Sequence, residues 1–246
     1  MNVRKKDVYF FFKFTNGSFN DDLMILLLTL DAIHFSGANR ITLVAPFLPY
    51  LRQDRRDESR VPISSARMIR MLEMTPSLQQ VITIDMHADQ LQAVFTIPTD
   101  HLPGQVVMAP WIKKRFAGDY NNLVLIAPDF GSAKRVRRLA KAIDPNISVS
   151  ILEKERGANN VEILSIIGAP VDGKVCLIND DMMDTCGTIA EAAKALYEYG
   201  AKQVIATATH PIMSKKGGVT AYEKLAQAKL EVVVTDSLDA ESHDWL

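Results

Sequence analysis

Cysteine is scarce in this sequence, and neither sign of charge is in excess. The two cysteines, Cys176 and Cys186, are too few for a disulfide framework or a four-cysteine zinc site. A reducing, cytoplasmic compartment is therefore expected. The 28 basic residues nearly balance 29 acidic ones, and the formal net charge is −1. Such a balance offers no attraction to nucleic acid or to an anionic membrane, so neither is expected as a partner.

Long apolar runs are also lacking. The richest run, residues 23–30, stands between Asp22 and Asp31. It is far shorter than the roughly 20 apolar residues that a membrane-spanning helix needs. We expect a buried helix there. Apolar residues make up 48% of the chain and charged residues 23%, which excludes a disordered protein. The 246 residues fit one large α/β domain or two small ones.

Short β-rich runs alternate with helix-length segments along the chain. Strands are predicted at 8–14, 41–46, 81–85, 123–127, 148–152, 175–179, 204–207 and 231–234. Helices are predicted at 21–35, 63–74, 132–143 and 189–199. This alternation is typical of βαβ units, in which helices cover a mainly parallel sheet. The rhythm occurs twice, with Pro98, Pro103 and Gly104 between the halves, so we predict two similar α/β domains at about 1–104 and 105–246.

The strongest sign of a binding site follows the predicted strand 175–179, because ligands of open α/β sheets lie at strand ends of this kind. Two adjacent carboxylates, Asp180 and Asp181, precede a turn that leads into a helix. The turn contains Asp184, Thr185, Cys186, Gly187 and Thr188. Backbone N–H groups at a helix start suit a phosphate, and carboxylates can accept hydrogen bonds from sugar hydroxyls. Helix capping is the simpler interpretation of the turn, but it leaves Asp180 and Asp181 unexplained. The segment predicts a site for a phosphorylated sugar.

A charged loop that contains Arg52, Gln53 and Asp54 follows the predicted strand 41–46. A guanidinium group can clamp phosphates with two hydrogen bonds, and an amide can recognise an adenine edge. A solvated loop is the usual interpretation of such a run, but this loop lies at the ligand end of the predicted sheet, which favours nucleotide binding. His87 also follows a strand. From the residues alone, a structural role and a ligand role for His87 are equally good interpretations.

Two more segments follow predicted strands. Pro128-Asp129-Phe130-Gly131 is a second acidic turn, and residues 153–161 contain Lys154 and Arg156 without apolar periodicity. For the latter, a solvated charged hairpin is the simpler interpretation.

In this order, the segments resemble those of the ribose-phosphate diphosphokinases (phosphoribosyl-diphosphate synthases). The segment 180–188 is also similar to the phosphoribosyl-diphosphate loop of type I phosphoribosyltransferases. Further matches are 59–64, Asp85-Met86-His87-Ala88-Asp89-Gln90 and Thr207-Ala208-Thr209-His210-Pro211. The resemblance covers nearly the whole chain. It implies an α/β fold with two tandem type I phosphoribosyltransferase-like domains, each a mainly parallel sheet flanked by helices. Residues 1–104 would bind ATP and residues 105–246 ribose phosphate.

The reaction that the resemblance implies is transfer of the β,γ-diphosphate of ATP to O1 of ribose 5-phosphate, with Mg²⁺ as cofactor. The products are 5-phosphoribosyl 1-diphosphate and AMP. Lys154 and Arg156 would be catalytic. ATP would bind to Arg52, Gln53, Asp54 and His87, and the ribose phosphate to Asp180, Asp181, Asp184, Thr185, Cys186, Gly187 and Thr188. Magnesium would be held by His87, Asp129 and Asp100. Relatives form homo-oligomers, from dimer to hexamer, and the same is expected here.

Some positions depart from the family pattern. Thr96 stands where many relatives have Asp, and Glu155 replaces a residue that is commonly basic. By the same resemblance, the chain begins well inside a usual member. An acidic, Phe-containing loop that clamps adenine in relatives is therefore expected to be missing. Three alternatives remain. The same transfer could serve a larger 5-substituted ribose such as ADP-ribose, the chain could be a non-catalytic regulatory relative, or it could be a phosphoribosyltransferase that consumes the diphosphate.

Overall fold

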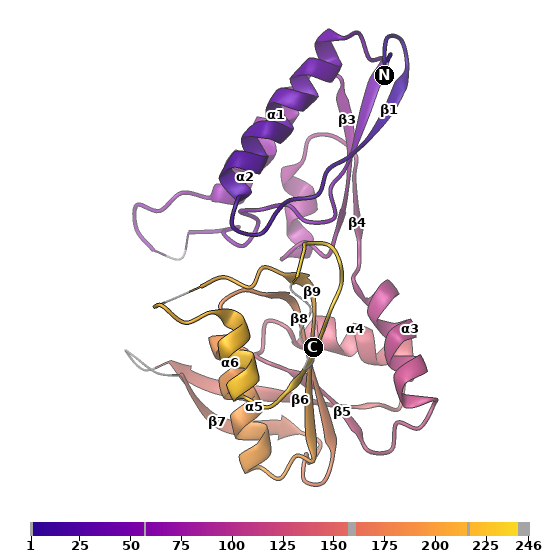
Figure 1. The fold of residues 1–246 in the computed structure, drawn as a ribbon. Coiled ribbons are helices and arrows are strands. Elements are labelled where there is room, and N and C mark those ends of the chain that lie inside the picture. The colour runs from indigo at the N-terminus through magenta and orange to yellow at the C-terminus, as the bar shows by residue number, and fades with distance from the viewer. Residues whose placement is uncertain (1, 57, 157–160, 216, 241–246) are drawn as a thin grey trace. The chain divides into compact units, whose positions relative to one another are not determined.

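The computed structural model describes residues 2–56, 58–156, 161–215 and 217–240, without the side chains of 154–156 and 161–164. The chain forms two compact units, Met1–Pro103 and Gly104–Leu246. Each unit is an α/β structure built on its own sheet (Figure 1). None of the helices in the described part is long and apolar enough to span a membrane.

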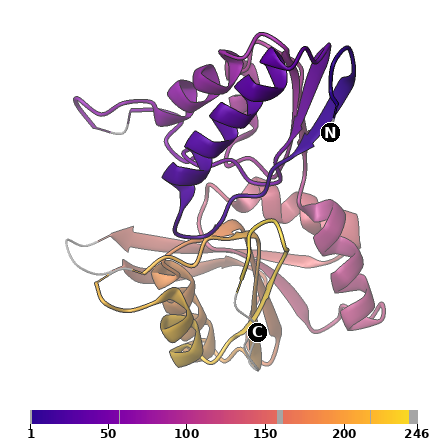
Figure 2. The same cartoon turned by 45° about the horizontal axis from the view of Figure 1, so that its top comes forward.

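The first unit has a four-stranded parallel sheet in the order β1-β2-β3-β4. Its strands are β1 (Asp7–Phe11), β2 (Arg40–Val44), β3 (Leu78–Ile84) and β4 (Thr99–Leu102). Its helices are α1 (Phe19–Phe35), α2 (Ser64–Glu73) and the short 3-10 helix η1 (Asp89–Val94). Helices α1 and α2 lie on the same side of this sheet (Figure 2). The buried residues of this unit include Leu26 and Leu30 of α1, Ile69 of α2 and Leu43 of β2.

Helix α1 is buried along one side only, which corrects the expectation of a buried helix. Leu26 and Leu30 are buried, whereas Met24, Ile25 and Leu28 are exposed. Tyr9 and Phe11 of the neighbouring edge strand β1 are also exposed. A helix that covers one face of a sheet buries only the side that faces that sheet, and the apolar residues of α1 continue onto its other sides. The first unit therefore presents apolar surface at β1 and α1.

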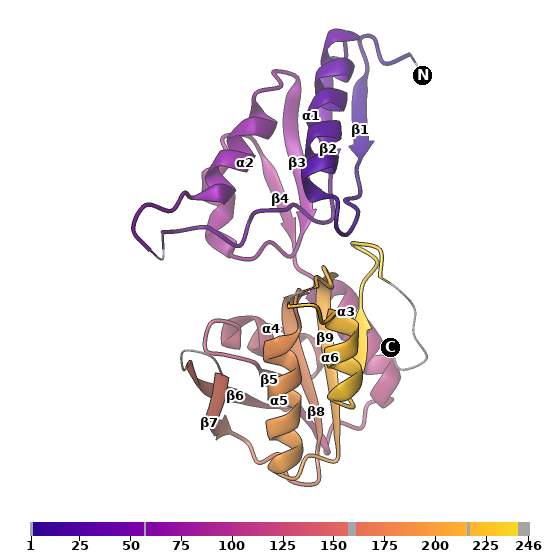
Figure 3. The same ribbon diagram turned by 60° about the vertical axis from the view of Figure 1, so that its left-hand side comes forward.

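The second unit has a six-stranded sheet in the order β10-β9-β8-β5-β6-β7, in which only β7 runs antiparallel to its neighbour. Its strands are β5 (Leu123–Ala127), β6 (Ser148–Arg156), β7 (Val161–Gly168), β8 (Val175–Met183), β9 (Gln203–Pro211) and β10 (Glu231–Val234). Its helices are α3 (Gln105–Phe116), α4 (Ala133–Ile143), α5 (Gly187–Glu198) and α6 (Ala221–Gln227). Helices α3 and α4 cover one face of the sheet, and α5 and α6 the other (Figure 3).

The predicted fold class is confirmed, since both sheets are mainly parallel and flanked by helices. Strands β5 and β10 occupy the predicted residues. Strand β8 is longer than predicted, because its pairing with β9 continues as far as Met183 and Pro211. Asp180 and Asp181 therefore lie inside a strand and not after it. Five elements were not predicted: β4, β7, α3, α6 and the short 3-10 helix η1.

Candidate functional site

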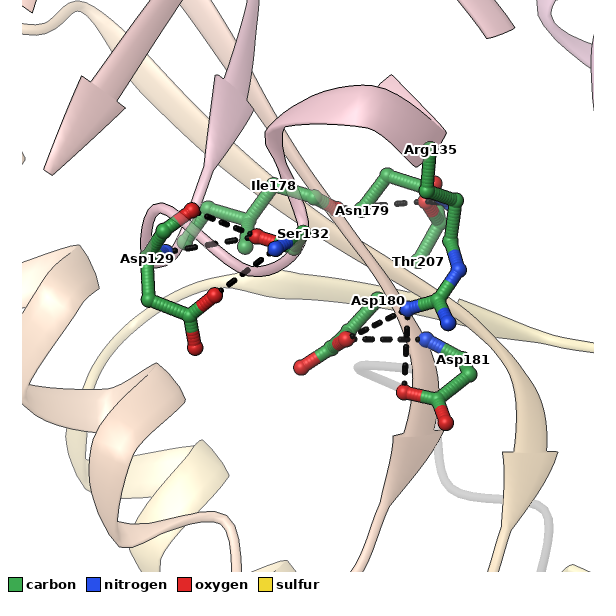
Figure 4. Close-up of polar contacts among 8 residues, drawn as sticks. All are labelled: Asp129, Ser132, Arg135, Ile178, Asn179, Asp180, Asp181 and Thr207. Carbon is green, nitrogen blue, oxygen red and sulfur yellow. Dashed lines mark hydrogen bonds and ion pairs between the residues drawn. The ribbon is translucent and has the colours of Figure 1, made fainter. Parts of the chain in front are cut away.

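The two adjacent carboxylates of β8 are bridged by an arginine of α4. The Nη1 atom of Arg135 lies 3.0 Å from Oδ1 of Asp180 and 3.0 Å from Oδ1 of Asp181 (Figure 4). The backbone N–H of Asp181 donates to Oδ1 of Asp180 at 2.9 Å. The side chain of Asp181 is only 3% exposed, against 23% for Arg135 and 27% for Asp180. One cation thus balances part of the charge of two crowded carboxylates.

Burial raises the pKa of the Asp180 carboxyl well above its usual range, and the carboxylate of Asp181 raises it further. Arg135 and the backbone N–H of Asp181 act in the opposite direction. Two neighbouring acids with one cation favour retention of a proton on Asp180. A ligand that brings hydroxyl donors to this pair would favour loss of that proton.

Substitution of Asp180 by asparagine should change how stability depends on pH. A carboxyl with a raised pKa binds its proton more tightly in the folded state, so stability falls as pH rises from the ordinary value of 3.8 toward the folded pKa. Asp180→Asn removes this titration. We expect its unfolding free energy in urea titrations to decline less than that of the wild type as pH rises above about 4. The matched control is Asp236→Asn, at an exposed position, and parallel curves for the wild type and Asp180→Asn would contradict the prediction.

The turn from β8 into α5 carries the residues of the predicted phosphate loop. Cys186 has left-handed backbone angles (φ 55°, ψ 7°) and stands at the cap position before α5 begins at Gly187. A Cβ atom at Gly187 would meet no other atom within 4 Å, so there is open space beside the helix start. Thr185 is half-buried and Thr188 exposed. The first N–H groups of a helix have no partner within the helix, so this loop is suited to an anion.

Cys186 contributes no nucleophile to this loop. Its thiol is buried, and burial raises its pKa to about 12, with Asp184 adding to the shift and Lys224 opposing it. The Sγ atom lies 3.7 Å from the backbone oxygen of Asp184. A thiol that stays protonated near neutral pH is a poor nucleophile, so the backbone of Cys186 is its contribution to the loop.

The second acidic turn, between β5 and α4, is organised by Asp129 and Ser132. The backbone N–H of Ser132 donates to Oδ1 of Asp129 at 2.8 Å, and Oγ of Ser132 donates to the backbone oxygen of Asp129 at 2.9 Å (Figure 4). A Cβ atom at Gly131 would lie 3.3 Å from Oδ1 of Asp129. The turn therefore leaves little room beside the carboxylate, which is exposed at the carboxyl end of β5.

In the first unit, the predicted nucleotide loop and the histidine segment are brought together. The Nε2 atom of Gln90 donates to Oδ2 of Asp54 at 2.9 Å. Oγ of Ser64 donates to Oε1 of Gln53, which ties the loop to the start of α2. Arg52 is exposed. Segments that lie 36 residues apart in the sequence thus form one polar surface after β2 and β3.

His87 follows a strained turn that a second histidine supports. Asp85 has a left-handed φ of 45°, and the backbone N–H of Met86 donates to Nε2 of His101 at 2.9 Å. His101 was not singled out in the sequence. Asp100 pairs in register with Ile82, inside β3, and its Oδ2 accepts a hydrogen bond from Gln80 at 2.7 Å. The described part of the chain holds no group of three or more His, Cys, Asp or Glu side chains that could bind a metal.

The predicted catalytic residues Lys154 and Arg156 lie in β6, where their backbones pair with Ile163 and Val161 of β7. The predicted charged loop is thus in part a β-hairpin. The side chains of Lys154 and Arg156, and residues 157–160, lie outside the described part of the chain.

Two α/β units, one carrying adjacent acids before the start of a helix, are typical of a protein of the phosphoribosyltransferase type. Residues 1–75 match the family described as the N-terminal domain of ribose phosphate pyrophosphokinase, and residues 100–236 match the phosphoribosyl transferase domain. The chain belongs to the ribose-phosphate pyrophosphokinase family.

Curated relatives and a solved structure agree with this assignment. The ribose-phosphate pyrophosphokinase of Burkholderia pseudomallei (strain K96243) is 44% identical, over 98% of this chain and 74% of the relative. Ribose-phosphate pyrophosphokinase 2 of Saccharomyces cerevisiae is 41% identical, over 95% and 71%. Phosphoribosylpyrophosphate synthetase from Mycobacterium smegmatis matches with a TM-score of 0.86 at 32% identity, over 97% of this chain and 75% of that one. The predicted family and two-domain fold are confirmed.

Proposed function

We propose that this chain transfers the β,γ-diphosphate of ATP to O1 of ribose 5-phosphate and releases 5-phosphoribosyl 1-diphosphate and AMP. The observation that carries the proposal is the Asp180–Asp181 pair, held by Arg135 in the strand that leads into the loop 184–188. In this segment, the two acids would accept hydrogen bonds from the sugar hydroxyls, and the loop that follows them would bind the phosphate of the same ribose. The curated relatives carry the same activity in their names.

The chemistry is an in-line displacement at phosphorus. The O1 oxygen of the sugar forms a bond to the β-phosphorus of ATP, and the bond from that phosphorus to the oxygen it shares with the α-phosphorus breaks. AMP leaves with that oxygen, and the O1 hydroxyl loses its proton. Such transfers depend on positioning and on neutralising negative charge. We assign the second task to Lys154 and Arg156.

The ribose 5-phosphate site is proposed in the second unit. Asp180 and Asp181 would accept hydrogen bonds from the sugar hydroxyls, with Arg135 holding both carboxylates in place. The phosphate would bind to the loop formed by Asp184, Thr185, Cys186, Gly187 and Thr188.

ATP binding is proposed for the first unit, through Arg52, Gln53, Asp54 and His87. The ties from Asp54 to Gln90 and from Gln53 to Ser64 support this, because they hold the loop in one arrangement. A loop fixed before binding loses less entropy when a nucleotide arrives.

Magnesium suits the residues present. It is usually held by one or two carboxylates together with substrate phosphates and waters. We propose the exposed carboxylate of Asp129 as one contact of magnesium, and His87 and Asp100 as other candidate contacts. The described residues contain no group of three such side chains, so the three are not proposed as one coordination site. The Asp100 carboxylate is engaged by Gln80, which makes it the weakest of the three. When bound, magnesium would neutralise charge on the ATP phosphates.

We also propose that the chain forms a homo-oligomer, from dimer to hexamer, in a cytoplasmic compartment. The apolar side chains exposed on β1 and α1, such as Phe11 and Leu28, support self-association. Sedimentation velocity of the purified chain measures the size of the assembly, and a monomer at all concentrations would contradict this part of the proposal.

The test of the function is AMP formation from ATP and Mg²⁺, with ribose 5-phosphate and ADP-ribose assayed in parallel. We expect rapid AMP release with ribose 5-phosphate and little with ADP-ribose. AMP formed only with ADP-ribose would overturn the substrate, and inactivity of a well-folded protein with both would overturn the enzyme in favour of a regulatory relative. Use of added 5-phosphoribosyl 1-diphosphate with a nucleobase would instead indicate a phosphoribosyltransferase.

A further inference from the structure

The phosphate loop between β8 and α5 has two consecutive backbone carbonyls held from outside the loop. The backbone N–H of Ser214, which follows β9, donates to the carbonyl oxygen of Asp184 at 3.1 Å. The Nζ atom of Lys224, on α6, donates to the carbonyl oxygen of Thr185 at 3.0 Å. The preceding residue, Met183, is held in the same way by the N–H of Met213 at 2.9 Å.

These contacts decide where the amide hydrogens of the loop point. A trans peptide group is planar, so its C=O and N–H point in opposite directions, and the described part of the chain has no cis peptide bond. With the Asp184 carbonyl fixed on Ser214, the N–H of Thr185 points away from Ser214. With the Thr185 carbonyl fixed on Lys224, the N–H of Cys186 points away from Lys224.

The result is a run of amide donors at the start of α5. Cys186 has left-handed backbone angles, and successive N–H groups around such a residue form an anion-binding concavity. The N–H groups of the first turn of α5 extend the run, because they have no acceptor within the helix. The peptide between Thr185 and Cys186 links the turn to the helix, and the Nζ atom of Lys224 holds its carbonyl oxygen.

Lys224 also brings a positive charge close to the loop. Its ammonium group is near enough to Cys186 to oppose the rise in the pKa of that thiol. Helix α6 is anchored next to this point by a capping box, in which Oγ1 of Thr220 accepts from the N–H of Glu223 at 3.1 Å and the Glu223 carboxylate accepts from the N–H of Thr220 at 2.7 Å. The lysine is therefore presented from a fixed helix start.

We propose that Lys224 is a positioning residue for the 5-phosphate of the substrate. Its ammonium group holds the Thr185 carbonyl, turns the Cys186 N–H toward the phosphate, and adds one positive charge behind the loop. The inference rests on the proposed function, because it assumes that the loop binds a sugar phosphate. It goes further by assigning phosphate affinity to a side chain in another helix, 39 residues along the chain from Thr185.

The test is calorimetric binding of ribose 5-phosphate, and of inorganic phosphate, to the full chain without ATP. Lys224→Met should weaken ribose 5-phosphate binding by about tenfold to a hundredfold, the effect of losing a charged hydrogen bond. In steady-state assays, KM for ribose 5-phosphate should rise while kcat and KM for ATP stay within about threefold. Lys224→Arg, which retains a donor and the charge, should restore most of the affinity. Lys194→Met, at an exposed position on α5, is the matched control.

The outcomes are distinguishable. If the wild type binds ribose 5-phosphate and Lys224→Met binds it equally well, the role of Lys224 is overturned and the proposed function stands. If the wild type itself fails to bind, the proposed function falls. Loss of binding in Lys224→Met that Lys224→Arg does not restore, together with a lower melting temperature, would make Lys224 a structural residue and overturn the inference.

Discussion

Replacement of Arg135 by leucine is expected to lower kcat/KM for ribose 5-phosphate by about 10²- to 10³-fold, because it leaves two neighbouring carboxylates without their shared cation. Arg135 contacts Asp180 and Asp181 at 3.0 Å each, and the Asp181 side chain is almost completely buried. Without the guanidinium group, the carboxylates repel each other and bind protons more strongly. They would then be poorer acceptors for the sugar hydroxyls.

Steady-state kinetics of Arg135→Leu measure the loss of kcat/KM, and urea unfolding measures the loss of stability. Stability should fall by about 3 kcal/mol, the usual cost of breaking a buried ion pair by removing one partner. The control is Arg137→Leu on the same helix, where the side chain is exposed; it should leave both quantities nearly unchanged. Equal kinetics for Arg135→Leu and the wild type would show that the carboxylates need no arginine and would remove Arg135 from the site.

Continuous apolar runs in the sequence predict most strands of the second sheet, because strands that are buried on both faces are apolar at successive positions. Strand β5, with all five residues buried, is the best example. Strand β7 was missed because it lies at a sheet edge and depends on antiparallel pairing with β6. Helix α3 was missed because Pro110, which lies inside it, is a residue that usually ends a helix, and because its apolar residues do not gather on one side.

The part of the candidate site that could be predicted consists of residues that lie close together in the sequence. The acids 180–181 and the loop 184–188 are one continuous segment, so their chemistry could be inferred locally. Arg135 and Lys224 could not be found in this way. Arg135 is one of several basic residues of α4, 45 residues from Asp180 in the sequence, and only the fold selects it. Lys224 likewise meets Thr185 only because α6 packs beside α5.

In the first unit, too, some contacts join residues that are far apart in the sequence. The interpretation of His87 could not be settled from its neighbours, because its turn is held by His101 from β4, a strand that was not predicted. A short strand such as Thr99–Leu102 carries too few residues for a period-2 pattern to stand out.

Replacement of Lys154 by alanine should reduce the rate of AMP formation by about 10²- to 10³-fold, as expected when one donor to the developing charge of a transition state is removed. Binding of ribose 5-phosphate should change little, since the loop 184–188 and the Asp180–Asp181 pair remain. Single-turnover rates and calorimetry separate these two quantities, and Lys202→Ala, at an exposed position, is the matched control. A chain that only regulates other subunits would be insensitive to Lys154→Ala. An unchanged rate would therefore remove Lys154 from catalysis, whereas a lost rate with intact sugar-phosphate binding places the lysine in the transfer step itself.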